Sequence, residues 1–167
     1  INEYLEFSLQ PLTQHSLESL HAIRAEFVQT KILPLISKQS RALLKKHKEQ
    51  GDYLLIITAT NLFVTEPIAQ ELNVDDIIAT TPEMINGQYT GKVAGIPSFQ
   101  HGKVTRLSDW LETSGLSLHG SFFYSDSHND LPLLEQVDFP VVVDADKTLL
   151  AHAKMKNWPI ISLRDEL

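Results

Sequence analysis

One segment of the chain, residues 122–134, limits the possible folds more than any other. Its apolar run 122–124 is typical of a buried strand, and two aspartates, Asp126 and Asp130, follow Ser125 four residues apart. This order places Asp126 at the carboxyl end of a strand and Asp130 at the start of the next helix, where open α/β sheets bind ligands. Two carboxylates that converge on one crevice repel each other unless a cation or a shared proton lies between them. The segment therefore indicates a Mg²⁺ site.

Strands and helices alternate after residue 51, which predicts an α/β fold with a doubly wound parallel sheet between two layers of helices. The continuous apolar run 53–57 is typical of a strand buried on both faces, and Asn86-Gly87 predicts a hairpin turn. Pro67 suits the first turn of a helix that begins near Glu66. The other expected strands are at about 77–80, at 141–143, at 160–163 and in the run that ends at Ser125. The other expected helices are at about 103–114 and in the stretches that end near 136 and 157.

The first fifty residues carry helical patterns only. Apolar residues recur at spacings of three and four in 13–27, and they lie on one face of the expected helix 34–50, which Gly51 ends. These helices are expected to belong to a helical insert or accessory domain, separate from the sheet.

Composition excludes several classes of function. The chain of 167 residues has no cysteine, so thiolate metal sites and cysteine nucleophiles are excluded. Its net charge of −7 disfavours nucleic acid or an anionic membrane as the main partner. No apolar run approaches membrane-spanning length, and we expect a cytoplasmic protein. A phosphorylated metabolite remains compatible with this charge, because a local cation can reverse the field within a site.

Two further sites could carry chemistry. The expected strand before Thr58 leaves hydroxyls and backbone N–H groups at a helix entry, which suits anion binding; alternatively, Thr58 or Thr60 caps that helix. Lys103 follows Gly102 at a helix start, where a lysine opposes the helix dipole unless it faces a negative partner. Taken alone, a lysine at the position of Lys103 would more often be a surface lysine, and Asp126 and Asp130 are also compatible with an N-cap and a first-turn aspartate.

The order of these sites resembles the haloacid dehalogenase superfamily of phosphohydrolases, and within it the phosphoserine-phosphatase-like branch. Residues 54–60 resemble its second motif, Gly102-Lys103 its third and residues 124–134 its fourth, which is the most specific match. Residues 86–91 resemble a Gly-x-x-Thr-Gly segment of this branch, and residues 157–160 resemble its closing strand. The resemblance implies that residues 1–50 are the later part of a helical cap with its return helix. Residues 51–167 would then form the core that holds motifs two to four.

The resemblance also implies a Mg²⁺-dependent phosphatase that forms a phosphoaspartyl intermediate. Thr58 would donate a hydrogen bond to a phosphoryl oxygen, and Lys103 would neutralise the nucleophile and the phosphate. Ala59 would contribute to phosphate binding, and Asn129 would orient the site. This distribution of cations and donors is what phosphoryl transfer requires of a protein.

The metal would be held by the aspartates of the fourth motif. By motif matching, Asp126 would bind Mg²⁺ and Asp130 would complete or brace the metal shell. His128 lies between the motif positions and is expected to be an exposed loop residue. The substrate would be a small phosphorylated metabolite, which the sequence does not name, and the oligomeric state is equally unreadable.

The family's first motif, an apolar strand followed by Asp-x-Asp-x-Thr, should precede the helical insert. Its letters occur instead at Val143-Asp144-Ala145-Asp146-Lys147-Thr148, near the other end of the chain. The order of elements favours a turn and a helix cap for Asp144 and Asp146. We expect the nucleophile and its strand to lie upstream of Ile1. Two alternatives stay open: a noncatalytic ligand-binding or receiver-like module, and an enzyme whose nucleophile is Asp144.

Overall fold

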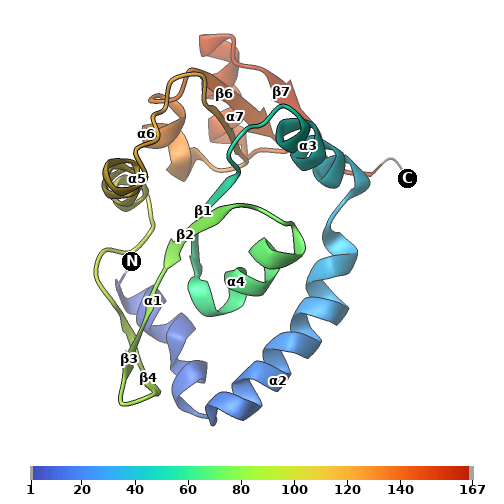
Figure 1. The fold of residues 1–167 in the computed structure, drawn as a ribbon. Helices are drawn as coiled ribbons and strands as arrows, with labels where there is room; N and C mark the ends of the chain where they lie inside the picture. Colours follow the sequence, from blue (N-terminus) through green and yellow to red (C-terminus); the bar gives the residue numbers. More distant parts are fainter. Residues whose placement is uncertain (1, 166–167) are drawn as a thin grey trace. The chain divides into compact units, whose positions relative to one another are not determined.

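The computed structural model describes residues 2–165, and their side chains from Leu5 onward. The chain forms two compact units (Figure 1). The first unit comprises residues 1–36 and 41–98, and the second comprises residues 37–40 and 99–167. The division into a cap and a core near residue 50 stays a prediction.

Helices and short irregular turns make up the start of the first unit. They are α1 (Asn2–Leu9), a 3₁₀ turn (Gln10–Thr13), α2 (Leu17–Phe27), a π turn (Val28–Ile32), a 3₁₀ turn (Leu33–Leu35) and α3 (Lys38–Glu49). Helix α2 begins later than its apolar pattern indicates, because the Ser16 hydroxyl caps it by accepting the Ser19 N–H at 3.3 Å. A buried cluster of Leu9, Leu12, Leu20 and Phe63 joins these helices to α4.

Helix α4 (Leu62–Glu71) begins four residues before the expected start near Glu66. The Asn61 side chain caps it by accepting the Val64 N–H at 3.1 Å, so Pro67 lies inside the helix and not in its first turn. A proline at this position leaves the carbonyl four residues earlier, that of Phe63, without its helical donor. The Arg24 guanidinium supplies the missing donor at 2.9 Å. The prediction for this helix was wrong because a side chain from α2 offsets the usual cost of an internal proline.

The strands of the first unit form a parallel pair and a hairpin. Strands β1 (Leu55–Asn61) and β2 (Asp76–Thr80) are parallel, with α4 as their crossover (Figure 1). Strands β3 (Pro82–Ile85) and β4 (Gln88–Val93) are antiparallel, and the expected turn at Asn86-Gly87 has positive φ at both residues. Gly91 packs tightly, since a Cβ there would lie 3.2 Å from side-chain atoms of Gln10 and Thr13.

The second unit is a parallel three-stranded sheet with helices. Its sheet order is β5 (Phe122–Ser125), β6 (Phe139–Val143), β7 (Ile160–Ile161), and its helices are α5 (His101–Ser114), α6 (Leu131–Leu134) and α7 (Lys147–Lys156). Leu134, Val142, Leu149 and Ala153 form a fully buried core between the sheet and the helices. Ser125 is in register with Val142. The turns that follow β5 and β6 therefore leave the sheet at the same edge.

The α/β class with parallel strands and covering helices is confirmed, but the parallel strands form two hydrogen-bonded sheets and not one. Among the described residues, β1 pairs only with β2, and β5 pairs only with β6. Their other edges accept no strand from the part of the chain described, and the pairing of a further strand there stays a prediction. Between residues 2 and 165, no helix has the length and apolar character needed to cross a membrane.

Candidate functional site

The turn after β5 presents one exposed and one buried carboxylate. Asp126 is exposed, and no hydrogen bond or ion pair of its carboxylate is found among residues 2–165. The Ser127 hydroxyl then caps a 3₁₀ turn (His128–Asp130) by accepting the Asn129 N–H at 3.3 Å. This turn carries Asp130 back beneath the strand end, where only 7% of it is exposed. The two aspartates of the fourth motif therefore differ in surroundings as well as in position.

Asp130 is held by two partners. Its Oδ1 lies 2.6 Å from the Lys103 ammonium nitrogen, and its Oδ2 accepts a hydrogen bond from the Ser125 hydroxyl at 2.7 Å. All three residues are 7% exposed. Burial of a carboxylate is tolerated when a cation and a hydrogen bond replace its water. Lys103 is therefore a buried cation with a negative partner, and not the surface lysine that the sequence left open.

Asn129 is oriented by a residue that the sequence reasoning missed. Gln100 Nε2 donates to Asn129 Oδ1 at 2.9 Å, while Asn129 Nδ2 donates to the Ser127 hydroxyl at 3.2 Å. Gln100 precedes α5 with φ 48 and ψ −120, a combination that L residues adopt only when their surroundings enforce it. No sequence motif identifies such a residue. A polar side chain just before Gly102-Lys103 was the available signal.

The turn after β6 uses both of its aspartates for internal contacts. Asp144 Oδ1 accepts the Ser162 hydroxyl at 2.7 Å, and its Oδ2 accepts the Leu163 N–H at 2.9 Å. Asp146 caps α7 by accepting two N–H groups of its first turn, each at 2.9 Å. The N–H of Leu163 holds the pKa of Asp144 below its ordinary value. The His128 main-chain N–H and the Leu149 N–H lower the pKa of Asp146 far below its usual range.

The residues of the fourth motif fit a divalent cation in part. A carboxylate without a protein partner, as at Asp126, suits direct coordination of a hard cation. Both oxygens of Asp130 are already occupied, so this residue suits bracing of the site better than coordination. No group of three His, Asp or Glu side chains that could enclose a metal occurs within residues 2–165. Mg²⁺ is compatible with such a sparse set, since it commonly keeps waters and takes one or two carboxylates together with substrate phosphate.

Thr58 and Ala59 belong to the first unit, and the four remaining candidates belong to the second: Lys103, Asp126, Asn129 and Asp130. The Thr58 hydroxyl accepts the Thr60 N–H at 3.2 Å, and the carbonyl of Ala59 accepts the Thr80 hydroxyl at 2.8 Å. Asn61, and neither Thr58 nor Thr60, caps the following helix. The main-chain N–H of Thr60 is thus engaged in a hydrogen bond within its own segment. The proposed role of Thr58 and Ala59 in phosphate binding stays a prediction.

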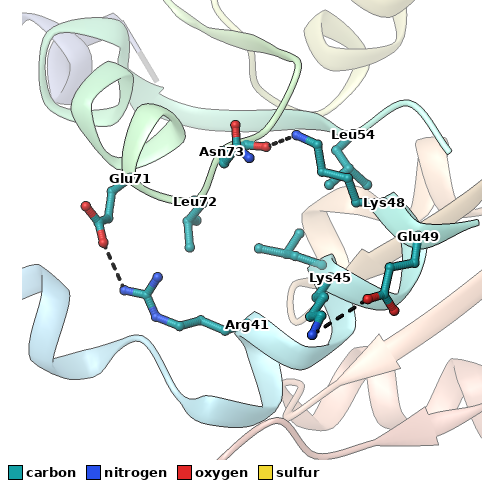
Figure 2. A pocket seen from close by; sticks show the side chains of 9 residues that line it. Arg41, Lys45, Lys48, Glu49, Leu54, Glu71, Leu72 and Asn73 are labelled. Carbon is teal, nitrogen blue, oxygen red and sulfur yellow. Dashed lines mark hydrogen bonds and ion pairs between the residues drawn. The ribbon is translucent and has the colours of Figure 1, made fainter. Parts of the chain in front are cut away.

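A pocket of about 460 Å³ lies elsewhere, within the first unit (Figure 2). Its apolar wall is Leu44, Leu54 and Leu72, the second of which directly precedes β1. Its three cations are engaged: Arg41 with Glu71 at 3.2 Å, Lys45 with Glu49 at 3.6 Å, and Lys48 with the Asn73 carbonyl. The pocket opens at the amino end of β1, whereas the ligands of parallel sheets bind at carboxyl ends. It does not contain the candidate site.

Comparison with known proteins decides the family. The sequence profile of the haloacid dehalogenase-like hydrolases matches residues 1–135. The chain belongs to this family. The expected superfamily is thereby confirmed, and phosphatases among the relatives confirm the likeness to its phosphoserine-phosphatase-like branch.

Two curated relatives have named activities. A histidinol-phosphatase of Neisseria meningitidis serogroup C is 40% identical over 168 residues, which cover 98% of this chain and 76% of that protein. A phosphoserine phosphatase of Mycobacterium tuberculosis is 30% identical over 149 residues, which cover 89% of this chain and 48% of that protein. The chain thus spans about half to three quarters of the length of these relatives.

Solved structures support the fold. A protein of unknown function from Bordetella pertussis Tohama I is 41% identical, with a TM-score of 0.94 over 98% of this chain and 74% of that one. A substrate-bound phosphoserine phosphatase is 15% identical, with a TM-score of 0.69 over 98% of this chain and 73% of that one. At this low identity, the second likeness supports the fold alone.

Proposed function

We propose that this protein is a Mg²⁺-dependent phosphatase that hydrolyses a small phosphomonoester through a phosphoaspartyl intermediate. The observation that carries the proposal is the contrast at the end of β5. The exposed Asp126 carboxylate has no partner among residues 2–165, and Asp130, further along the same turn, forms a buried pair with Lys103 that Ser125 braces. This arrangement supplies a free carboxylate for a cation and an ammonium group for phosphate at one strand end of a known hydrolase fold.

In the proposed reaction, each residue of the second unit has a separate task. Asp126 would hold the cation, which when bound would offset the negative charge of the phosphate. Lys103 Nζ has donors beyond the one directed at Asp130, and these would bind a phosphoryl oxygen. Asp130 keeps the lysine in place, and Asn129 is held in turn by Gln100. Thr58 and Ala59 would add donors to the phosphate, as the motif order predicts.

The attacking group is proposed to be an aspartate of the family's first motif, outside residues 1–167. Within the chain, the letters of this motif occur at Asp144 and Asp146. Four hydrogen-bond donors already occupy the oxygens of Asp146, and two occupy those of Asp144. A carboxylate with its lone pairs engaged in this way is a poor nucleophile, which supports a structural role for both.

We further propose a substrate with an ammonium group next to the phosphate ester. Histidinol phosphate and phosphoserine, which the names of the two relatives indicate, share the unit phosphate–O–CH₂–CH(NH₃⁺). They differ in the next group, an imidazolylmethyl in one and a carboxylate in the other. The higher identity and coverage of the histidinol-phosphatase favour histidinol phosphate for this chain. The action would be on a free metabolite, and we expect it in the cytoplasm.

Release of inorganic phosphate by the full-length protein tests both levels of the proposal. Histidinol phosphate, O-phosphoserine and p-nitrophenyl phosphate would each be assayed with Mg²⁺ and after chelation with EDTA. We expect turnover with Mg²⁺, loss of activity with EDTA, and a kcat/KM for histidinol phosphate at least about tenfold above that for phosphoserine, or ~1.4 kcal/mol. Activity that survives EDTA would contradict the metal-dependent mechanism. A preference for phosphoserine would contradict the substrate alone.

A further inference from the structure

Asp146 connects the two turns at the end of the second sheet. Its main-chain N–H donates to the Asp126 carbonyl at 3.0 Å. Its Oδ2 accepts the His128 main-chain N–H at 2.7 Å and lies 2.9 Å from His128 Nδ1. Three contacts thus run from one residue of the β6–α7 turn to the short segment 126–128.

The other end of this connection is fixed. Asp146 Oδ1 accepts the N–H groups of Thr148 and Leu149, so Asp146 is fixed as the N-cap of α7. Leu149 and Ala153 anchor α7 in the core with no exposed surface. The segment 126–128 is therefore tied to a helix that is anchored in the core of the unit.

The contacts also explain why Asp146 does not compete with Asp126 for a cation. Its two oxygens face four donors, and the amino end of α7 favours negative charge at this position. Asp126 has the opposite pattern, because its main-chain carbonyl is held while its carboxylate has no partner in the part of the chain described. One aspartate holds the backbone so that the other can direct its side chain outward.

We propose that Asp146 is a positioning residue for the metal site, which orients the Asp126 carboxylate by fixing the turn 126–128 against α7. The inference rests on the proposed Mg²⁺ dependence of Asp126. Groups that orient a metal ligand from behind typically change metal affinity by about 10–100-fold when removed. Here the ligand is held through its main chain and its neighbour, so an effect at the lower end of that range is expected.

Asp146→Ser separates this role from helix capping. Serine is as good an N-cap as aspartate, but its single oxygen cannot cap α7 and reach His128 together. Asp144→Asn is the matched control, because Asp144 lies in the same turn and contacts Ser162 and Leu163 instead. Asparagine also tolerates the φ of 45 found there. His128→Ala removes the ring contact and leaves the main-chain one.

Two readouts would be made on the full-length protein: the Kd for Mg²⁺ by calorimetry, and hydrogen exchange of the His128 amide in metal-free protein. For Asp146→Ser we expect a Kd about tenfold higher, His128 exchange at least about tenfold faster and a urea midpoint only slightly below that of wild type. For His128→Ala we expect a rise in Kd of about threefold, and for Asp144→Asn no change in Kd. If Asp146→Ser fails to fold, the Kd of His128→Ala for Mg²⁺ tests the positioning role instead, and an unchanged Kd in that variant would overturn it.

The outcomes separate this inference from the proposed function. A wild-type protein that does not bind Mg²⁺ would overturn the proposed function, and the positioning role with it. Normal wild-type binding with an unchanged Kd in Asp146→Ser would overturn the positioning role only. An equal rise in Asp146→Ser and Asp144→Asn would also overturn it, because the effect would then come from the β6–α7 turn in general.

Discussion

Two turns of the second unit follow parallel strands, carry a pair of aspartates each and lie at the same edge of the sheet. After β5, Asp130 is buried against Lys103 and Ser125, while the Asp126 side chain is exposed and has no partner within the described part of the chain. After β6, the donors of neighbouring turns and of α7 occupy Asp144 and Asp146. Aspartates at equivalent positions of the two turns thus have different roles. The β5 turn presents a carboxylate that is able to bind a ligand, whereas the carboxylates of the β6 turn are already hydrogen-bonded.

The difference comes from the donors within reach and not from the carboxylates. The β6 turn leads directly into α7, whose free N–H groups need acceptors, and β7 brings the Leu163 N–H beside Asp144. The β5 turn leads into a short 3₁₀ segment that Ser127 already caps. The Asp126 carboxylate is consequently not needed as a cap. A carboxylate that makes no hydrogen bond within the fold is a better candidate for function than one whose oxygens are already hydrogen-bonded.

The largest effect should follow from Lys103→Met. Among the described residues, the substitution leaves the buried Asp130 carboxylate with the Ser125 hydroxyl as its one partner, and removal of one member of a buried pair costs ~3–5 kcal/mol. The free energy of unfolding, measured with urea at neutral pH, should fall by this amount. The double variant Lys103→Met/Asp130→Asn is the control and should recover a large part of the loss. A loss below about 1 kcal/mol in the single variant would show that the pair is solvated.

The second largest effect should be a loss of phosphatase activity that differs between substitutions in the two turns. With the full-length protein, Asp126→Asn should lower kcat/KM by about 100-fold or more, equivalent to ~2.7 kcal/mol, because a neutral amide replaces the proposed metal ligand. Asp144→Asn should stay within about threefold of wild type, or ~0.7 kcal/mol. Phosphate release under saturating Mg²⁺ measures both. If instead Asp144→Asn were inactive and bound Mg²⁺ normally, Asp144 would be the nucleophile and the comparison would be reversed.

Sequence reasoning predicted those features that depend on local chemistry. The alternation of strands and helices, the turn at Asn86-Gly87 and the end of α5 at residue 114 all follow from backbone propensities and were confirmed. The placement of Asp126 at a strand end was equally readable. These features need only the neighbours along the chain.

Features that depend on distant partners were not predictable. The helical Pro67 is tolerated because Arg24, far away in the sequence, donates to the Phe63 carbonyl. The strained backbone of Gln100 accompanies its contact with Asn129. His128 is exposed, as expected of a loop residue, but its contacts with Asp146 could not be read from the letters. In each case, the deciding atom belongs to an element whose approach only the fold determines.

A smaller loss of stability should show how much Asp146, in the β6 turn, contributes to the free energy of unfolding. Asp146→Ala removes the cap of α7 together with the His128 contacts, and loss of an N-cap aspartate costs ~1 kcal/mol. Asp146→Ser keeps the cap and should cost only a few tenths of a kcal/mol by the same reasoning. Urea unfolding of the metal-free protein measures both. Equal losses in the two variants would mean that the His128 contacts, and not the cap, stabilise this turn.

The smallest effect concerns the dependence of stability on pH. The Leu163 N–H, with the Ser162 hydroxyl and Arg164, holds the pKa of Asp144 below its ordinary value of 3.8. Because the folded-state pKa is the lower one, the stabilisation from Asp144 is complete above about pH 5 and is lost as the pH falls through the folded-state pKa. Asp144→Asn should therefore narrow the difference between the urea midpoints at pH 7 and pH 2.5. Ser162→Ala removes only one of the donors and should narrow it by less. An unchanged difference in Asp144→Asn would mean that this carboxylate is not used by the fold, and would restore it as a candidate for chemistry.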